Sequence, residues 1–103
     1  MRLMDIGTMS WEFPSELTHW RGPAPYHFIP VPKDVADALH SVSNLLTYGW
    51  GVIPVTVRIE ETLFKTSLFP KDGGYLIPVK DVVRRGLGLT LGDPVTVELI
   101  VGA

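Results

Sequence analysis

Proline and glycine interrupt this 103-residue chain so often that few segments can form a long regular element. Nine prolines and ten glycines are spread along it, from Gly7 to Gly102. Proline removes a backbone donor and glycine favours turns, so this spacing is typical of β-rich domains and not of helical bundles. There is no linker or low-complexity tract, and a chain of this length supports one core. We therefore predict a single compact domain over residues 1–103.

Alternation between apolar and other residues predicts the strands. The clearest case is the C-terminal run, where every second residue from Val95 to Val101 is aliphatic. Pro14 is expected to stop or bulge the first strand, because proline cannot donate to a ladder. Hairpin turns are expected at residues 60–62 and at "KDGG", residues 71–74. The expected strands cover residues 10–13, 26–29, 55–59, 63–69, 75–79 and 95–101.

Two segments have a helical period. In "PKDVADALHSVSNLL" the apolar residues Val35, Leu39, Val42 and Leu46 recur at intervals of four, three and four, which predicts one amphipathic helix. The segment "KDVVRRGLGL", residues 80–89, is long enough for only one to two turns, which must be held by packing. A glycine near its end, at position 86 or 88, is expected to terminate it.

The stretch "LGDPVTVEL" predicts a sharp turn from the short helix into the last strand. Gly92 can adopt a backbone conformation that is costly for other residues, and the Asp93 carboxylate can accept hydrogen bonds from nearby turn amides. Pro94 should then occupy the first position of the strand. Together these elements predict a mainly β fold, a β-barrel with one main α-helix and one short helix.

Residues 73–99, "GGYLIPVKDVVRRGLGLTLGDPVTVEL", resemble the half-barrel of AbrB-like transition-state regulators and MazE-like antitoxins. The shared order is a strand, Ile-Pro, a short helix with Arg, Leu-Gly-Leu, Gly-Asp and a strand. The resemblance covers about a quarter of the chain. It implies a cradle-loop type of β-barrel and, as one alternative, a dimeric nucleic-acid-binding regulator, although fold does not carry function.

Four segments spread over almost the whole chain carry a second resemblance: "YHFIPVPKDVADAL", "YGWGVIPVTVRI", "TSLFPKDGGYLIPVKDVVRRGLGL" and "LGDPVTVELIV". In this order they resemble the bacterial domain of unknown function 1905 family, and the "TSLFPKDG" and "PVKDVVR" blocks make the resemblance specific. It implies a small β-barrel, alone or fused to other modules, and brings no established activity.

Charge and composition exclude several classes of protein. The sequence has no cysteine, which removes disulfides, Cys-ligated zinc and thiol chemistry. The formal net charge of −2 speaks against a general nucleic-acid binder. Asp5 interrupts the apolar run that a signal peptide needs, and no apolar run reaches the roughly 18 residues that cross a bilayer. We expect a soluble, cytoplasmic protein without a membrane segment.

The C-terminal half offers a candidate anion site. Lys80 and Arg84 stand four residues apart on the expected short helix and so face the same way. With Lys71 in the preceding turn and Thr66 or Ser67 on the neighbouring strand, they can surround an anionic group. The alternative is that these charges are simply solvated.

One aromatic residue adds to this site. Trp50 lies between two glycines in "YGWGV", where its ring is expected either to cover a pocket or to plug one end of the barrel.

Other chemistry has less support in the sequence. His19, His27 and His40 lack metal-ligand spacing, so we expect no metal and no cofactor. No nucleophile elbow, paired catalytic carboxylates or phosphate-binding glycine loop is present. The sequence therefore predicts a non-catalytic binding module, monomeric or homodimeric, for a small anionic ligand or a protein partner. The alternatives are an AbrB-like nucleic-acid-binding regulator and a small-barrel enzyme.

Overall fold

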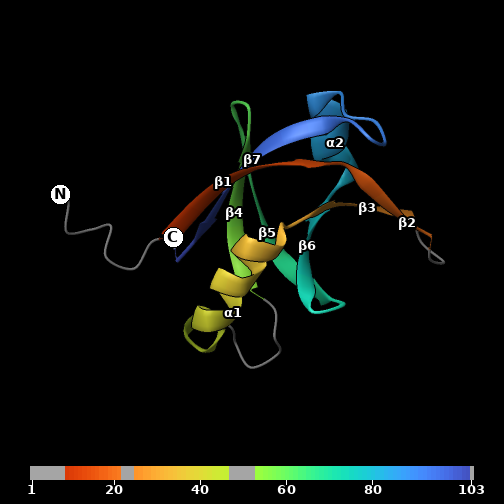
Figure 1. The fold of residues 1–103 in the computed structure, drawn as a ribbon. Coiled ribbons are helices and arrows are strands. Elements are labelled where there is room, and N and C mark those ends of the chain that lie inside the picture. Colours follow the sequence, from red (N-terminus) through yellow and green to blue (C-terminus); the bar gives the residue numbers. More distant parts are fainter. Residues whose placement is uncertain (1–8, 22–24, 47–52, 103) are drawn as a thin grey trace.

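The computed structural model describes residues 9–21, 25–46 and 53–102, which form seven strands and two helices (Figure 1). The strands are β1 (Met9–Glu16), β2 (Thr18–Arg21), β3 (Pro25–Pro30), β4 (Ile53–Ile59), β5 (Thr62–Lys71), β6 (Gly74–Val79) and β7 (Pro94–Val101). The helices are α1 (Lys33–Leu46) and α2 (Asp81–Leu87). The prediction of a mainly β fold with one main and one short helix is confirmed.

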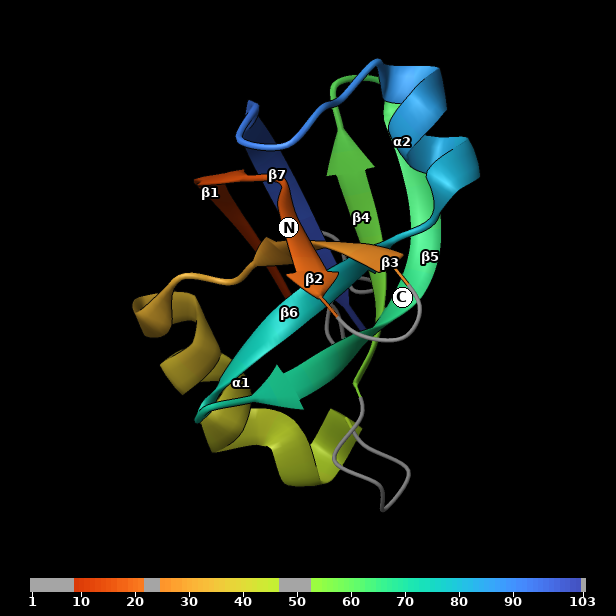
Figure 2. The ribbon, with the colours of Figure 1, turned by 90° about the vertical axis from the view of Figure 1, so that its right-hand side faces the viewer.

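All seven strands belong to one antiparallel sheet with the order β1-β7-β4-β5-β6-β3-β2. The sheet curls into a half-barrel (Figure 2). Its two outermost strands, β1 and β2, are consecutive parts of one chain segment, separated only by Leu17. β1 pairs with β7 and β2 pairs with β3, so this one segment joins the two edges of the sheet.

Leu17 holds this corner through its backbone and its side chain. Its N–H donates to the carbonyl oxygen of Asp93 at 3.1 Å, and its own carbonyl oxygen accepts from the N–H of Gly92 at 2.9 Å. The side chain is only 1% exposed. Gly92 has a φ of 83°, and the Asp93 carboxylate accepts hydrogen bonds from the N–H of Thr90 at 2.8 Å and its hydroxyl at 3.1 Å. The turn that starts β7 therefore also fixes the corner between β1 and β2.

The prediction that Pro14 stops or bulges the first strand is wrong. β1 continues to Glu16, and Pro14 pairs with Thr96 of β7. Because β1 is an outermost strand, the missing N–H of Pro14 falls on the side where no neighbouring strand lies. The prediction also missed β2, whose four residues are too few to show a clear alternation.

The core forms from the inward-facing residues of the strands and from one face of α1. Strands β5 and β6 form a hairpin whose turn consists of Asp72 and Gly73. These two residues have positive φ values of 53° and 79°, as a two-residue type I′ turn requires. Among the side chains whose exposure the structure describes, the buried ones are hydrophobic, with Tyr75 counted among them. The buried core residues are Phe13, Leu17, Ile29, Val31, Val35, Ala36, Leu39, Ile53, Val55, Val57, Ile59, Leu68, Tyr75, Ile77, Val79, Leu89, Val95, Val97, Leu99 and Val101.

Helix α1 packs against β4 and β6. His40 ties it to the β5–β6 turn, because its Nε2 donates to the carbonyl oxygen of Gly73 at 3.0 Å. A carbonyl oxygen only accepts, so the proton lies on Nε2, and Nδ1 faces the Tyr75 hydroxyl at 3.5 Å. Burial raises the pKa of Tyr75 above its ordinary value. The side chains of Val42 and Leu46, predicted to face the core, lie outside the described residues.

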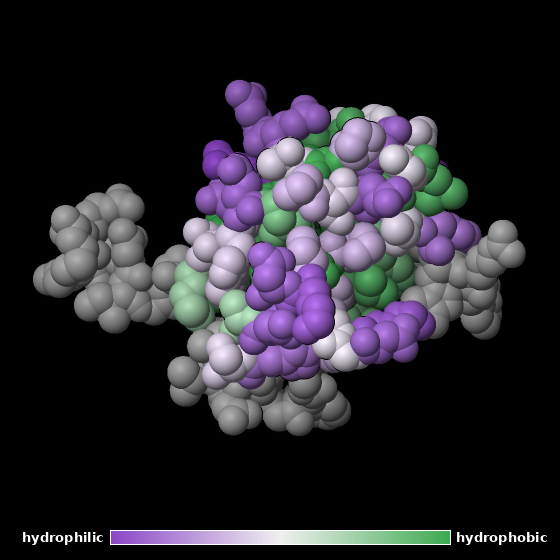
Figure 3. Space-filling view, in the orientation of Figure 1, coloured by the Kyte–Doolittle hydropathy of each residue, from purple (hydrophilic) through white to green (hydrophobic). Residues whose placement is uncertain are grey.

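Helix α2 is more superficial, because none of its residues is buried. Val83 and Leu87 are partly buried against the core, whereas Val82 is exposed. The helix ends at Gly88, in the left-handed region. Within the described residues, neither helix is long and apolar enough to cross a membrane. Hydrophilic residues cover much of the face shown in Figure 3, with apolar residues interspersed among them.

Candidate functional site

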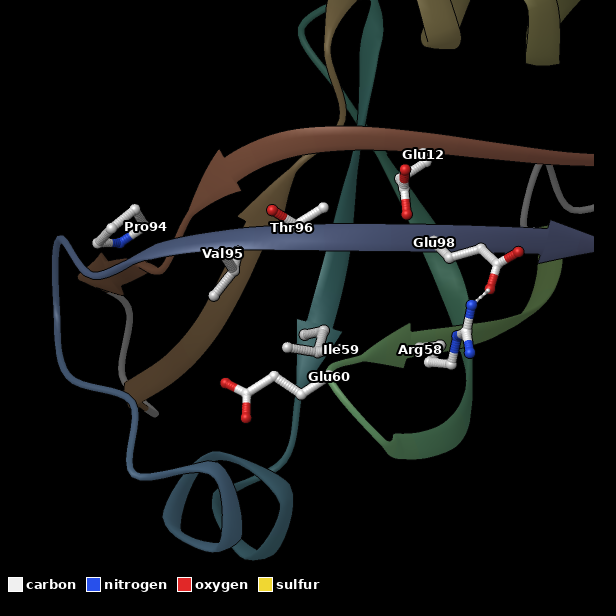
Figure 4. Close-up of a pocket in the computed structure, with 8 residues that line it drawn as sticks. All are labelled: Glu12, Arg58, Ile59, Glu60, Pro94, Val95, Thr96 and Glu98. Carbon is white, nitrogen blue, oxygen red and sulfur yellow. Dashed lines mark ion pairs between the residues drawn. The ribbon is translucent and has the colours of Figure 1, made fainter.

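The outer face of β1, β7 and β4 carries a row of charged side chains. Glu12 in β1 is the cross-strand partner of Glu98 in β7, and Glu98 is in turn the partner of Arg58 in β4. The residues that alternate with them are buried or partly buried, so the three side chains project outward together. Figure 4 shows them following one another across the three strands. Strand register therefore assembles the row from distant parts of the sequence.

This row borders a hollow of about 470 Å³, which we call the acidic hollow. Its volume lies within the range of small-ligand pockets, roughly 300–1,000 Å³. Two of its lining residues, Ile59 and Val95, are apolar and buried, whereas most of the others are polar. The lining residues are Glu12, Arg58, Ile59, Glu60, Pro94, Val95, Thr96 and Glu98.

The acidic hollow carries an excess of negative charge. Nη2 of Arg58 lies 2.7 Å from Oε1 of Glu98, and this ion pair offsets the repulsion between Glu98 and Glu12 across the two strands. Neither Glu12 nor Glu60 forms an ion pair with any residue that the structure describes. Two carboxylates at this hollow are therefore available to a cation.

A second group of ionisable side chains lies where α2 meets β2 and β3. Nδ1 of His27 and Nε of Arg84 lie 3.6 Å and 3.5 Å from the same carboxylate oxygen, Oδ1 of Asp81. Both nitrogens are buried, and neither forms a hydrogen bond within the described part of the chain. The ring of His19 meets the ring of His27 edge-on, with centroids 5.3 Å apart. We call His19, His27, Asp81 and Arg84 the α2 cluster.

The surroundings of His27 disfavour its charged form. Burial of the ring is the largest cause that lowers the pKa of His27 below its ordinary value of 6.5. The positive charge of Arg84 and then that of His19 lower this pKa further, while Asp81 acts in the opposite direction. His27 is therefore mainly neutral at pH 7. Arg84 also donates from Nη1 to the carbonyl oxygen of Leu89 at 3.3 Å, so it holds the segment that follows α2.

The structure separates the lysines of the anion site predicted from the sequence. Lys80 and Arg84 both lie at α2, Lys80 immediately before its first residue. Lys71 pairs with Gly74 at the opposite end of β6, whereas Lys80 follows Val79. A strand rises about 3.3 Å per residue, so Lys71 and Lys80 are separated by roughly 17–20 Å along β6. Lys71 is therefore not brought together with Lys80 and Arg84.

The hydroxyl residues predicted for that site are also divided. Thr66 and Ser67 are consecutive residues of β5, so their side chains lie on opposite faces of the strand. Thr66 is partly buried beside Val55, and Ser67 is exposed beside Pro54. Trp50, the predicted lid or plug, lies outside the described residues.

Sequence reasoning missed both groups of charged residues. The alternation of each strand indicates that Glu12, Arg58 and Glu98 point outward. Only the register of the strands shows that the three residues form one row. His27 and Asp81 come together because β3 pairs with β6, which leads directly into α2. Within the described ranges, no three histidine, aspartate or glutamate side chains are grouped so that they could hold a metal ion.

Comparison with known proteins identifies the family. No curated protein matches the sequence significantly. The family described as domain of unknown function (DUF1905) matches residues 13–99, which extend from β1 to β7 and include every residue of the two charged groups except Glu12. The chain therefore belongs to the DUF1905 family.

Proposed function

We propose that the domain is a non-catalytic binding module, and that the acidic hollow receives a cationic group of its ligand. The observation that carries this proposal is the presence of Glu12 and Glu60, without an ion pair to any described residue, beside a ligand-sized hollow. Carboxylates in this position attract an ammonium or guanidinium group.

Arg58 supports this role by orienting Glu98. The 2.7 Å contact is a short, charge-assisted one and uses Oε1 of Glu98, so the second carboxylate oxygen can accept a hydrogen bond from a ligand. The cation can belong to a small amine or to a Lys or Arg side chain of a protein partner. A nucleic-acid ligand is disfavoured at this hollow, because its phosphates would meet carboxylates. The proposal includes a cytoplasmic location, since a chain without cysteine needs no oxidising compartment.

The proposal predicts that cationic ligands stabilise the protein through Glu12 and Glu60. Agmatine, spermidine and a short Lys/Arg peptide should raise the melting temperature of the wild type. A ligand at ten times its Kd contributes about 1.4 kcal/mol, which corresponds to roughly 5–10 °C in a domain of this size. The double substitution Glu12→Gln and Glu60→Gln should abolish the rise and leave the melting temperature without ligand nearly unchanged, because both residues are exposed.

The matched control is Glu61→Gln, which removes an exposed carboxylate of the same turn that does not line the acidic hollow. This variant should respond to each ligand as the wild type does. An equal loss of response in both variants would show a nonspecific charge effect and contradict the proposal. A response to the peptide alone would identify a protein partner as the ligand.

An anionic ligand at α2 is a second candidate. Lys80, Arg84 and Arg85 face only one carboxylate on this helix, Asp81, so the helix is locally basic. Because Arg84 is bound to Leu89, a substitution there would also disturb the fold. The test is therefore the pair Lys80→Ala and Arg85→Ala, both at exposed residues, which should abolish thermal stabilisation by phosphate and leave the unliganded melting temperature nearly unchanged. Stabilisation by phosphate that persists in this variant would remove the candidate.

A further inference from the structure

Helix α2 is held to the sheet by few contacts. None of its residues is fully buried, and its apolar attachment consists of the partly buried Val83 and Leu87. The only polar contact between α2 and β3 in the described part of the chain is the 3.6 Å approach of His27 to Asp81. Segments with so little buried surface open at lower cost than the strands of a core.

The charged groups that face His27 come from two elements. α2 contributes Asp81 and Arg84, and β2 contributes His19. From β6 the residue paired with His27 is Val79, which carries no charge. A proton on His27 therefore places an imidazolium beside the guanidinium of Arg84, with one carboxylate shared between the two cations.

The carboxylate of Asp81 attracts a protonated His27 and Arg84 too weakly to offset the repulsion between these two cations. The side chain of Asp81 is 59% exposed, so water screens its charge, and Arg85 also approaches it, at 4.0 Å. The nitrogens of His27 and Arg84 that face Asp81 are buried and lack a hydrogen bond, so neither compensates for lost hydration. Protonation thus favours any arrangement in which His27 is hydrated and further from Arg84.

We propose that the α2 cluster is a proton-sensitive latch, which keeps α2 on β3 when His27 is neutral and releases it when His27 is protonated. Release of α2 exposes Val83 and Leu87, which are partly buried against the core when the helix is docked. The direction of the pH dependence of docking follows from the linkage between docking and the protonation of His27. The pKa of His27 is lower with α2 docked than in water, so docking is strongest above the ordinary histidine pKa and weakens as the pH falls below it.

The test is an NMR titration of the full chain from about pH 7.5 to about pH 5, where histidine changes charge. We expect the helical ¹³Cα secondary shifts of Val82 and Val83 to fall in step with the ring signals of His27, with a midpoint below the ordinary histidine pKa of about 6.5. The shifts of β4, which lies in the core, should stay constant. A helix that keeps its shifts while His27 titrates would overturn the proposal.

Three variants make the result specific. His27→Gln, which keeps a polar side chain but cannot titrate in this range, should abolish the change in α2. His19→Gln removes an exposed group that lowers the pKa of His27, so it should move the midpoint to higher pH without unfolding the protein. His40→Gln, at α1 beside Gly73, should leave the transition of α2 unchanged. The latch is wrong if α2 loosens equally in His27→Gln, or if His40→Gln, and not His19→Gln, moves the midpoint.

Discussion

Replacing Leu17 with alanine should lower the free energy of unfolding by about 3 kcal/mol, within the range of roughly 2–5 kcal/mol for buried leucine truncations. The side chain is almost fully buried in the core, and a smaller residue leaves a cavity at the corner of the sheet. The two backbone hydrogen bonds to Gly92 and Asp93 do not involve the side chain, so they are retained. Urea unfolding should show a lower midpoint, and the melting temperature should fall by roughly 15 °C.

Leu63→Ala is the matched control, because it removes the same atoms from a residue that is 61% exposed. Its effect should lie within about 0.5 kcal/mol of zero. A Leu17→Ala variant as stable as Leu63→Ala would mean that the corner between β1 and β2 is not part of the core, and the closure of the sheet at Leu17 would have to be abandoned.

Replacing Gly92 with valine should cost about 2 kcal/mol through the backbone alone. Gly92 has a φ of 83°, a region that is costly for L-residues and most costly for β-branched ones. A Cβ at this position would meet no atom within 4 Å, so the Cβ itself adds no steric overlap to the cost of the backbone conformation. The free energy of unfolding, from urea or thermal denaturation, measures the effect.

Two further variants separate backbone strain from the loss of glycine as such. Gly92→Asn should cost less than Gly92→Val, because asparagine tolerates the left-handed region. Gly86→Ala, in α2 and also facing open space, should stabilise the protein by roughly 0.5–1 kcal/mol, because alanine favours a helix. Equal costs for valine and asparagine at position 92 would contradict the strain argument.

Local signals were sufficient for most elements of the fold. The period of residues 33–46, the alternation of β7 and the Asp72-Gly73 turn each reflect interactions between near neighbours in sequence, and the structure contains all three elements. The prediction that Pro14 interrupts the first strand was wrong, because the effect of a proline depends on whether its strand is an outer one. The local sequence does not show this. The closure at Leu17 joins residue 17 to residues 92 and 93, so no local pattern could predict it.

The candidate sites were less predictable for the same reason. Lys80 and Arg84 could be placed together because one helix carries them, but Lys71 was grouped with them by closeness in sequence, and the length of β6 keeps it apart. Glu12 and Glu98 are 86 positions apart, and only the pairing of β1 with β7 places them side by side. A predicted register of the strands, and not further motif analysis, would have been needed to find the acidic hollow.

The pairing of β1 with β7 also decides how this domain can be joined to other polypeptides. Met9 and Val101 are cross-strand partners, so the Cα atoms at the two ends of the sheet segment lie about 5 Å apart. The start of β1 and the end of β7 thus lie side by side. A host protein could carry the domain within a surface loop without stretching that loop, and linking the two ends by a short peptide would permit circular permutation at an exposed turn.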